Sequence, residues 1–190
     1  MGETVPTFDT LVGSYGVAYT DPFKDTFHRD ADGILRAICE GPRTGGPAHA
    51  RELHPYRQRE AMERLLCAGY SGPPSRDERG VLRVLPLLDD ADDPTRGCVQ
   101  TVIPPMCDPC KTKATQACPR LRDGHVELRV KEAEKIGVWG TLYPPAGVEG
   151  EPVPDALVLF NSPDEGRVIA RRPVRELRDF TVVAVVSPTS

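Results

Sequence analysis

The chain has 190 residues, of which 39% are hydrophobic and 27% charged, with a formal net charge of −4. This length suits a single domain, and no apolar run approaches the roughly 18 residues needed to span a bilayer. The acidic balance excludes a global attraction to nucleic acid or to an anionic membrane surface. The N-terminal stretch MGETVPTFDT has neither the basic nor the apolar region of a secretory signal, so we expect a cytoplasmic protein with no membrane partner.

The N-terminal flank, residues 1–53, has no clear helical or strand periodicity. It contains the Asp-rich stretch TDPFKDTFHRDADG and the loop-type stretch EGPRTGGPAHA. Between them, GILRAICE is compatible with a short strand or with one helical turn. We therefore expect a loosely ordered flank that wraps around the domain or is partly mobile.

A helix and a hairpin are predicted next. Residues 54–67, HPYRQREAMERLLC, have apolar side chains at near-helical spacing, and Pro55 suits the first helical position. Gly69 and the following SGPP end this helix. Residues 77–88, DERGVLRVLPLL, then predict a hairpin arm that follows a turn at Arg79–Gly80.

The segment after the hairpin predicts one strand and one helix. Residues 98–103, CVQTVI, are β-branched in the manner of a strand, and two prolines stop them. Residues 108–118, DPCKTKATQAC, are rich in helix formers, with Asp108 as the predicted N-cap and Pro109 at the first helical position. Pro119 ends this second helix.

The C-terminal part of the chain is rich in strand-forming residues. Alternating or β-branched patterns predict strands at residues 125–130, 136–145 and 155–160. Residues 172–180, RPVRELRDF, predict a short helix that begins near a proline. The final apolar run at residues 181–186, TVVAVV, predicts a fully buried last strand.

The cysteines carry the clearest chemical signal. Six cysteines are too few for a disulfide scaffold, and in a reducing compartment a close pair more often marks metal or redox chemistry. Cys107 and Cys110 form a Cys-x-x-Cys pair at a predicted helix N-terminus, where the helix dipole favours thiolates. Cys67 stands where a second pair would begin, but Tyr70 occupies the position of its second thiol. The pattern predicts a zinc site on Cys67, Cys107 and Cys110.

The fourth ligand of this zinc site is left open by the sequence. His54 and His125 are possible fourth ligands because spacing does not constrain them, and water or a substrate could take the position instead. Cys118 lies eight residues after Cys110, about 12 Å along a continuous helix, so it is a poor candidate. Two other interpretations of the Cys107–Cys110 pair also stay open: a redox or disulfide pair, and plain buried thiols.

The order of these features resembles a treble-clef zinc finger over residues 65–118. A knuckle, a hairpin and a cysteine pair that opens a helix follow one another, as in the class that includes ribosomal and HNH-nuclease-type fingers. The resemblance implies a zinc module that is degenerate at Tyr70. The stretches HPYRQREAMERLLC and IPPMCDPC are also similar to segments of small actinobacterial proteins, in which the first cysteine belongs to an intact pair. This second resemblance transfers no activity.

These features together predict an α+β fold. We expect a mixed, β-rich sheet with few short helices and an inserted treble-clef-like zinc module. The chain is divided into the flank at residues 1–53, the helix and cysteine module at residues 54–122, and a β-rich remainder of the same domain at residues 123–190.

Known enzyme signatures fit poorly. Zinc nucleobase deaminases require a glutamate where Gly69 stands, and an HNH-type nuclease requires a histidine on the hairpin arm, which has none. No phosphate-binding loop, nucleophile elbow or dinucleotide fingerprint is present. We therefore predict a zinc-binding accessory or regulatory interaction protein with a mainly structural metal site. The alternative is a small metal- or cysteine-dependent enzyme of biosynthetic type with an open coordination position in a pocket near Tyr70.

The partner is an unknown macromolecule or small ligand. Two basic stretches interrupt the acidic average and could follow phosphates if they shared one face of the protein. A solvated charged face, balanced by nearby acidic residues, is the favoured explanation of them, so nucleic acid is a candidate partner but not the favoured one. The basic patch consists of Lys111, Lys113, Arg120, Arg122, Arg171, Arg172 and Arg175.

Overall fold

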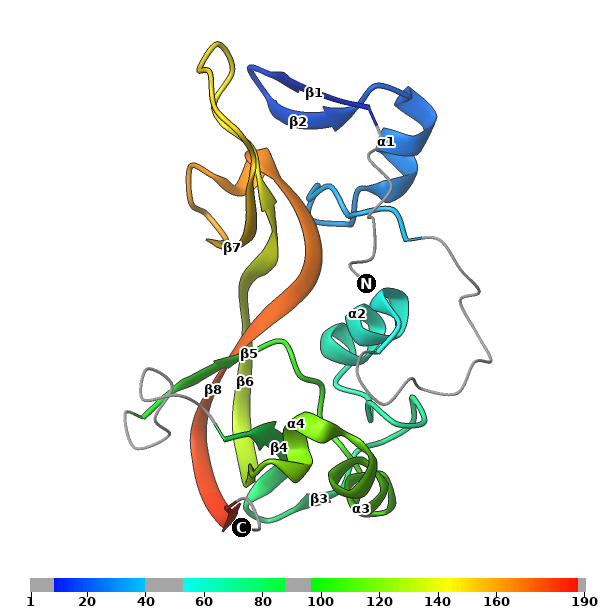
Figure 1. The fold of residues 1–190 in the computed structure, drawn as a ribbon, viewed down its shortest axis with the longest axis vertical. Coiled ribbons are helices and arrows are strands. Elements are labelled where there is room, and N and C mark those ends of the chain that lie inside the picture. Colours follow the sequence, from blue (N-terminus) through cyan, green and yellow to red (C-terminus); the bar gives the residue numbers. More distant parts are fainter. Residues whose placement is uncertain (1–8, 40–52, 88–96, 188–190) are drawn as a thin grey trace. The chain divides into compact units, whose positions relative to one another are not determined.

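The computed structural model describes residues 9–39, 53–87 and 97–187 (Figure 1). Strands predominate in these ranges and the helices are short, which confirms the predicted α+β class. None of the described helices is long and apolar enough to cross a membrane. Contacts divide the described chain into two compact units, the first made of residues 9–39 and 137–172, and the second of residues 53–87, 97–136 and 173–187.

The first unit contains regular structure in the flank that we expected to be loosely ordered. Gly16 has a φ of +109°, a conformation that favours glycine, and it allows a tight hairpin turn. Asp21 then caps a helix, because its carboxylate accepts the backbone N–H groups of Phe23 and Lys24. Residues 1–8 and 40–52 of the flank lie outside the described residues. The elements of the flank are β1 (Thr10–Gly13), β2 (Gly16–Tyr19) and α1 (Pro22–His28).

Two long strands contribute residues to both units. β6 (His125–Leu142) joins the strands predicted separately at residues 125–130 and 136–145, and β8 (Val168–Val186) ends the described chain. In the first unit β7 (Val153–Leu159) pairs antiparallel with β6, and the short 3-10 helix η3 (Glu165–Arg167) leads into β8. The core between these elements is formed by Ile34, Val138, Val158, Val168 and Ala170. The three-part division predicted at residues 53–54 and 122–123 stays a prediction.

The second unit contains the cysteine segment. The predicted hairpin is present around Arg79–Gly80, and the predicted helices at residues 54–67 and 108–118 are present in shortened form. Within the described residues the strands lie in the order β3-β4-β6-β8-β5, and α4 packs against β4 (Figure 1). The elements are α2 (Pro55–Glu63), β3 (Arg76–Asp77), β4 (Gly80–Pro86), β5 (Val99–Thr101), α3 (Asp108–Ala117) and α4 (Pro119–Arg122).

The predictions for the C-terminal residues are wrong in two respects. Residues 172–180 form part of strand β8 rather than a helix, because residues 175–177 pair antiparallel with β5 and Leu177 is buried in the sheet core. Tertiary pairing thus overrides the local helix signal. Residues 181–186 do form a strand, but they are not fully buried: Val183 and Val185 are 41% and 61% exposed.

Helix α2, which leads to Cys67, is attached to β8 through one side chain. Arg175 donates to the carbonyl oxygens of Met62 at 2.6 Å and Glu63 at 3.0 Å, and also to the carbonyl of Ala133 at 2.5 Å. Met62 and Glu63 lie in the last turn of α2, where carbonyls have no partner within the helix. Arg175 therefore caps α2 from a distant strand.

Arg83, on β4, is fully buried, unlike the half-buried Arg175, and has fewer partners. Its Nη1 donates to the carbonyl of Ile103 at 2.6 Å and lies 3.9 Å from the sulfur of Met62. Within the part of the chain that the structure describes, its Nε and Nη2 are buried without a hydrogen-bond partner. Burial, and next the nearby Arg175, lower the pKa of Arg83 to about 9. The environment thus disfavours the charged form of this side chain.

This contrast predicts opposite results for two matched substitutions. Arg175→Met removes three hydrogen bonds to carbonyls and leaves the end of α2 uncapped, so we expect the free energy of unfolding to fall by about 2–4 kcal/mol. Arg83→Met removes a desolvated charge and keeps an apolar stem of similar length, so we expect a change of less than about 1 kcal/mol, or a gain. Urea denaturation followed by circular dichroism measures both values.

An Arg83→Met loss as large as that of Arg175→Met would contradict this assignment. It would show that the Arg83 guanidinium has a compensating partner in the folded protein.

Candidate metal centre

A tight turn after α2 positions the first cysteine. The helix ends at Glu63, the N–H of the C-cap residue Arg64 donates to the carbonyl of Glu60, and Leu65 adopts a positive φ of 54° that redirects the chain. The N–H of Cys67 then donates to Gly72 O at 2.7 Å, and the N–H of Ser71 donates to Cys67 O at 2.9 Å. These two bonds close a compact turn with the Cys67 side chain at its start.

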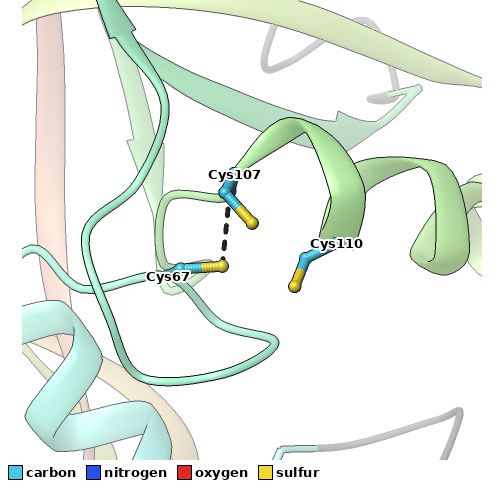
Figure 2. Close-up of side chains that lie close together, drawn as sticks. All are labelled: Cys67, Cys107 and Cys110. Atoms are coloured by element: carbon cyan, nitrogen blue, oxygen red, sulfur yellow. Dashed lines mark hydrogen bonds between the residues drawn. The ribbon is translucent and has the colours of Figure 1, made fainter.

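Backbone hydrogen bonds bring this turn to the second cysteine segment. The N–H of Ala68 donates to Pro105 O at 2.8 Å. The N–H of Cys107 donates to Cys67 Sγ at a nitrogen–sulfur distance of 3.3 Å, the dashed line in Figure 2. Two segments that lie forty residues apart in the chain are therefore joined directly beside the sulfur of Cys67.

Helix α3 supplies the other two thiols. Cys107 is the N-cap residue of α3 and Asp108 is its first helical residue, so the helix begins one residue earlier than predicted. Cys110 follows in the first turn, where helix N–H groups and the helix dipole favour thiolates. The sulfur atoms of Cys67, Cys107 and Cys110 all lie within 4.8 Å of one another and point toward a common space (Figure 2).

This spacing is compatible with one bound metal ion. Zinc–sulfur bonds of about 2.3 Å in a tetrahedron place the sulfurs about 3.8 Å apart, so small side-chain movements would suffice. Cys67 is fully buried, and Cys107 and Cys110 are half-buried. The surrounding core cluster is apolar and includes Leu82, Val84, Met106 and Leu121.

Gly69 keeps the turn close to the thiols. A Cβ at this position would clash with the sulfur of Cys110 and would lie 2.7 Å from its Cβ. The missing side chain therefore lets the backbone of the turn approach α3. The sequence shows a glycine here, but only the structure gives the physical reason for it.

The thiols differ in proton affinity. Burial raises the pKa of Cys110 to about 12, and hydrogen bonds to the neighbouring thiols add to this shift. Burial also raises the pKa of Cys107, but hydrogen bonds from the backbone N–H of Cys110 and from the thiols of Cys110 and Cys67 outweigh it, so the net shift is downward. Cys107 thus loses its proton more readily than Cys110, and a metal ion would displace the remaining thiol protons on binding.

Tyr70 lies at the position where a fourth thiol was missing in the sequence pattern. Its ring is 54% exposed, and its hydroxyl donates to Pro73 O at 2.7 Å. Burial first, and then the charges of Cys107, Cys67 and Cys110, raise the pKa of Tyr70. The phenol therefore stays protonated, and its hydroxyl is engaged away from the three sulfurs.

The two histidines considered as fourth ligands make other contacts. His54 caps α2, since its Nδ1 accepts the N–H of Tyr56 at 3.3 Å and its ring stacks on that of Tyr56. His125 is buried at the start of β6, with Nδ1 2.9 Å from Leu121 O and Nε2 3.8 Å from Glu127 Oε1. Among the described residues, the group of close ligand atoms contains the three cysteines and neither imidazole.

One residue beside the centre has no signal in the local sequence. The Oγ of Ser75 accepts the N–H of Asp108 at 3.0 Å and donates to its carboxylate. The N–H of Ser75 also donates to Met106 O at 3.0 Å. Ser75 thus holds the start of α3 from the strand side, and a capping partner thirty-three residues away cannot be found from local spacing.

The residues of the predicted basic patch have different environments. Lys111 forms an ion pair with Glu127 at 2.9 Å, Arg171 pairs with Asp155 at 2.9 Å, and Arg175 binds backbone carbonyls. Arg171 and Arg172 belong to the first unit and the other patch residues to the second. Of the patch residues in the second unit, Lys113, Arg120 and Arg122 are exposed.

Comparisons with known proteins do not assign the chain to a family. No family model matches it, and no curated protein or solved structure is detectably similar to it. The interpretation of the cysteine cluster therefore rests on its own geometry.

We predict that Gly69→Ala weakens metal binding by at least about tenfold, because the added methyl group displaces Cys110 from its position. The affinity is measured by zinc titration against a chromogenic competitor. Gly13→Ala is the matched control, since a Cβ there meets nothing within 4 Å. Equal zinc affinities of Gly69→Ala and Gly13→Ala would contradict this prediction, because they would show that a side chain at position 69 does not displace Cys110.

Proposed function

We propose that the protein is a zinc-binding accessory or regulatory interaction protein whose three-cysteine centre is mainly structural. The observation that carries this proposal is the convergence of three cysteine sulfurs from two chain segments within 4.8 Å. All three donors are sulfur, which favours zinc over the hard cations magnesium and calcium.

A structural role is supported by what the centre would join. A metal ion on Cys67, Cys107 and Cys110 would tie the turn after α2 to the first turn of α3. A closed thiolate zinc site contributes roughly 10–16 kcal/mol of binding free energy, comparable with the whole stability of a domain of this size, about 5–15 kcal/mol. Zinc bound here would therefore be inseparable from folding of the second unit.

A degenerate treble-clef-like arrangement is part of the proposal. Its support is the element order, in which the turn at Cys67 precedes the β3–β4 hairpin and the cysteine pair opens α3. The missing thiol at Tyr70 makes the site degenerate. In this arrangement the hairpin and the helix would enclose the metal ion, whose role would be to stabilise the fold and not to catalyse a reaction.

An interaction role is supported by exposed apolar side chains in the first unit. Trp139 on β6 lies opposite Leu157 on β7, and the two residues are 38% and 44% exposed. Exposed aromatic and aliphatic groups on a strand face are typical of protein contacts. We propose a macromolecular partner or small ligand in the cytoplasm, with nucleic acid less favoured because Lys111, Arg171 and Arg175 already bind groups of the same chain.

A second candidate function is a small metal- or cysteine-dependent enzyme. The half-exposed ring of Tyr70 beside the half-buried Cys107 and Cys110 favours it, because solvent or substrate could approach an open coordination position. A catalytic zinc keeps such a position, with three protein ligands and one exchangeable ligand.

Metal removal distinguishes the structural role from the catalytic one. The purified full chain is expected to contain about one zinc ion, measured by elemental analysis. Chelation, or the double substitution Cys107→Ser and Cys110→Ser, is expected to lower the melting temperature by well over 10 °C, because the metal would supply much of the folding free energy.

Cys98→Ser provides the matched control, since Cys98 is exposed and lies outside the cluster. It should leave both the zinc content and the melting temperature unchanged. Unaltered melting of the double variant would exclude a structural metal and favour the enzyme.

A further inference from the structure

We propose that the three-cysteine centre also binds a trivalent metalloid, arsenic(III) or antimony(III), as a three-coordinate ion held by Cys67, Cys107 and Cys110. This inference rests on the metal-binding function proposed above, and it specifies which ions complete the same site without a ligand from outside the protein.

The donor set is the first reason. All the grouped ligand atoms among the described residues are cysteine sulfurs, and no imidazole or carboxylate belongs to the group. Sulfur donors select soft ions. A trivalent metalloid is such an ion, and it forms strong bonds to thiolate sulfur.

The coordination number is the second reason. Zinc in proteins takes four ligands, so this centre would bind it with three sulfurs and one external ligand. A trivalent metalloid binds three sulfurs in a pyramid, and its lone pair occupies the fourth direction. Three thiols therefore saturate this ion but leave zinc one ligand short.

The surroundings of the missing corner are the third reason. The hydroxyl of Tyr70 donates to Pro73 O at 2.7 Å, so it is engaged with the backbone. The backbone of Gly69 lies against Cys110, close enough that a Cβ would clash with its sulfur. The turn thus lies close to the sulfur of Cys110, and the described residues offer no further protein donor to the group.

The binding reaction needs no oxidant or reductant. Arsenous acid carries three hydroxyl groups, and each exchanges with one cysteine thiol. Three arsenic–oxygen bonds break, three arsenic–sulfur bonds form, and three water molecules leave with the thiol protons. Arsenic remains trivalent throughout. From the zinc-loaded chain, the zinc ion leaves together with its external ligand, and solvent supplies the protons with which the three hydroxyl groups leave as water.

The test titrates the full chain, in the form in which it is purified, with arsenite. Its cysteines are kept reduced by a phosphine, which carries no thiol that would compete for arsenic. A chromogenic indicator follows zinc release, and alkylation with peptide mass spectrometry counts the protected thiols. We expect one arsenic per chain, with Cys67, Cys107 and Cys110 protected together. Starting from the zinc-loaded chain avoids any need for the metal-free protein to fold.

Substitutions then distinguish how the site binds zinc from how it binds arsenic. Tyr70→Cys adds a fourth thiol, so zinc affinity should rise at least about tenfold more than arsenite affinity. Cys110→Ser should weaken arsenite binding by at least about tenfold, whereas Cys118→Ser, outside the cluster, should retain it. The half-buried Cys110 is chosen because substitution of the fully buried Cys67 endangers folding.

Each result has a distinct meaning. Zinc that stays bound in a large excess of arsenite overturns the metalloid proposal and leaves the zinc proposal intact. Arsenite bound through two thiols overturns the three-coordinate assignment. A chain that binds neither ion contradicts both proposals. An equal rise of both affinities in Tyr70→Cys shows that the metalloid uses the fourth corner and also overturns the assignment.

Discussion

The structure of the second unit depends on the meeting of two chain segments at the sulfur of Cys67. Backbone bonds from Ala68 to Pro105 and from Cys107 to the Cys67 sulfur hold the turn against the start of α3. The apolar cluster with Leu82 and Met106 removes both segments from water, and a metal ion bound by the three sulfurs would join the same two segments.

The position of this turn also depends on how α2 is held. Arg175 satisfies carbonyls in the last turn of α2 from strand β8, more than a hundred residues later in the chain. Arg83, on β4, has only one strong acceptor and is largely desolvated. The half-buried Arg175 thus has acceptors for its donors, whereas the buried Arg83 has few among the described residues, and only the former arrangement offsets the cost of desolvating the charge.

The chemistry of the centre follows from which ligand atoms of the described residues lie close together, and these are the sulfurs of Cys67, Cys107 and Cys110. His54 caps a helix, His125 lies near a carbonyl and Glu127, and the Tyr70 hydroxyl binds a backbone oxygen. Three sulfurs remain as the donors of the group. A soft ion is therefore favoured, and the number of ligands that the ion demands decides whether the protein can complete its shell alone.

Local patterns in the sequence determined the α+β class, the hairpin at Arg79–Gly80 and the Cys107–Cys110 pair at a helix start, because each depends on residues within one or two turns of the chain. Residues 172–180 were wrongly predicted as a helix, since their conformation depends on pairing with β5. Cysteine spacing also predicted that Cys67 joins the later pair, and the structure places the three sulfurs together. Tertiary structure alone decided that Ser75 holds α3 and that neither imidazole belongs to the close group of ligand atoms among the described residues. Those contacts are set by burial and by hydrogen bonds between distant segments, about which sequence spacing carries no information.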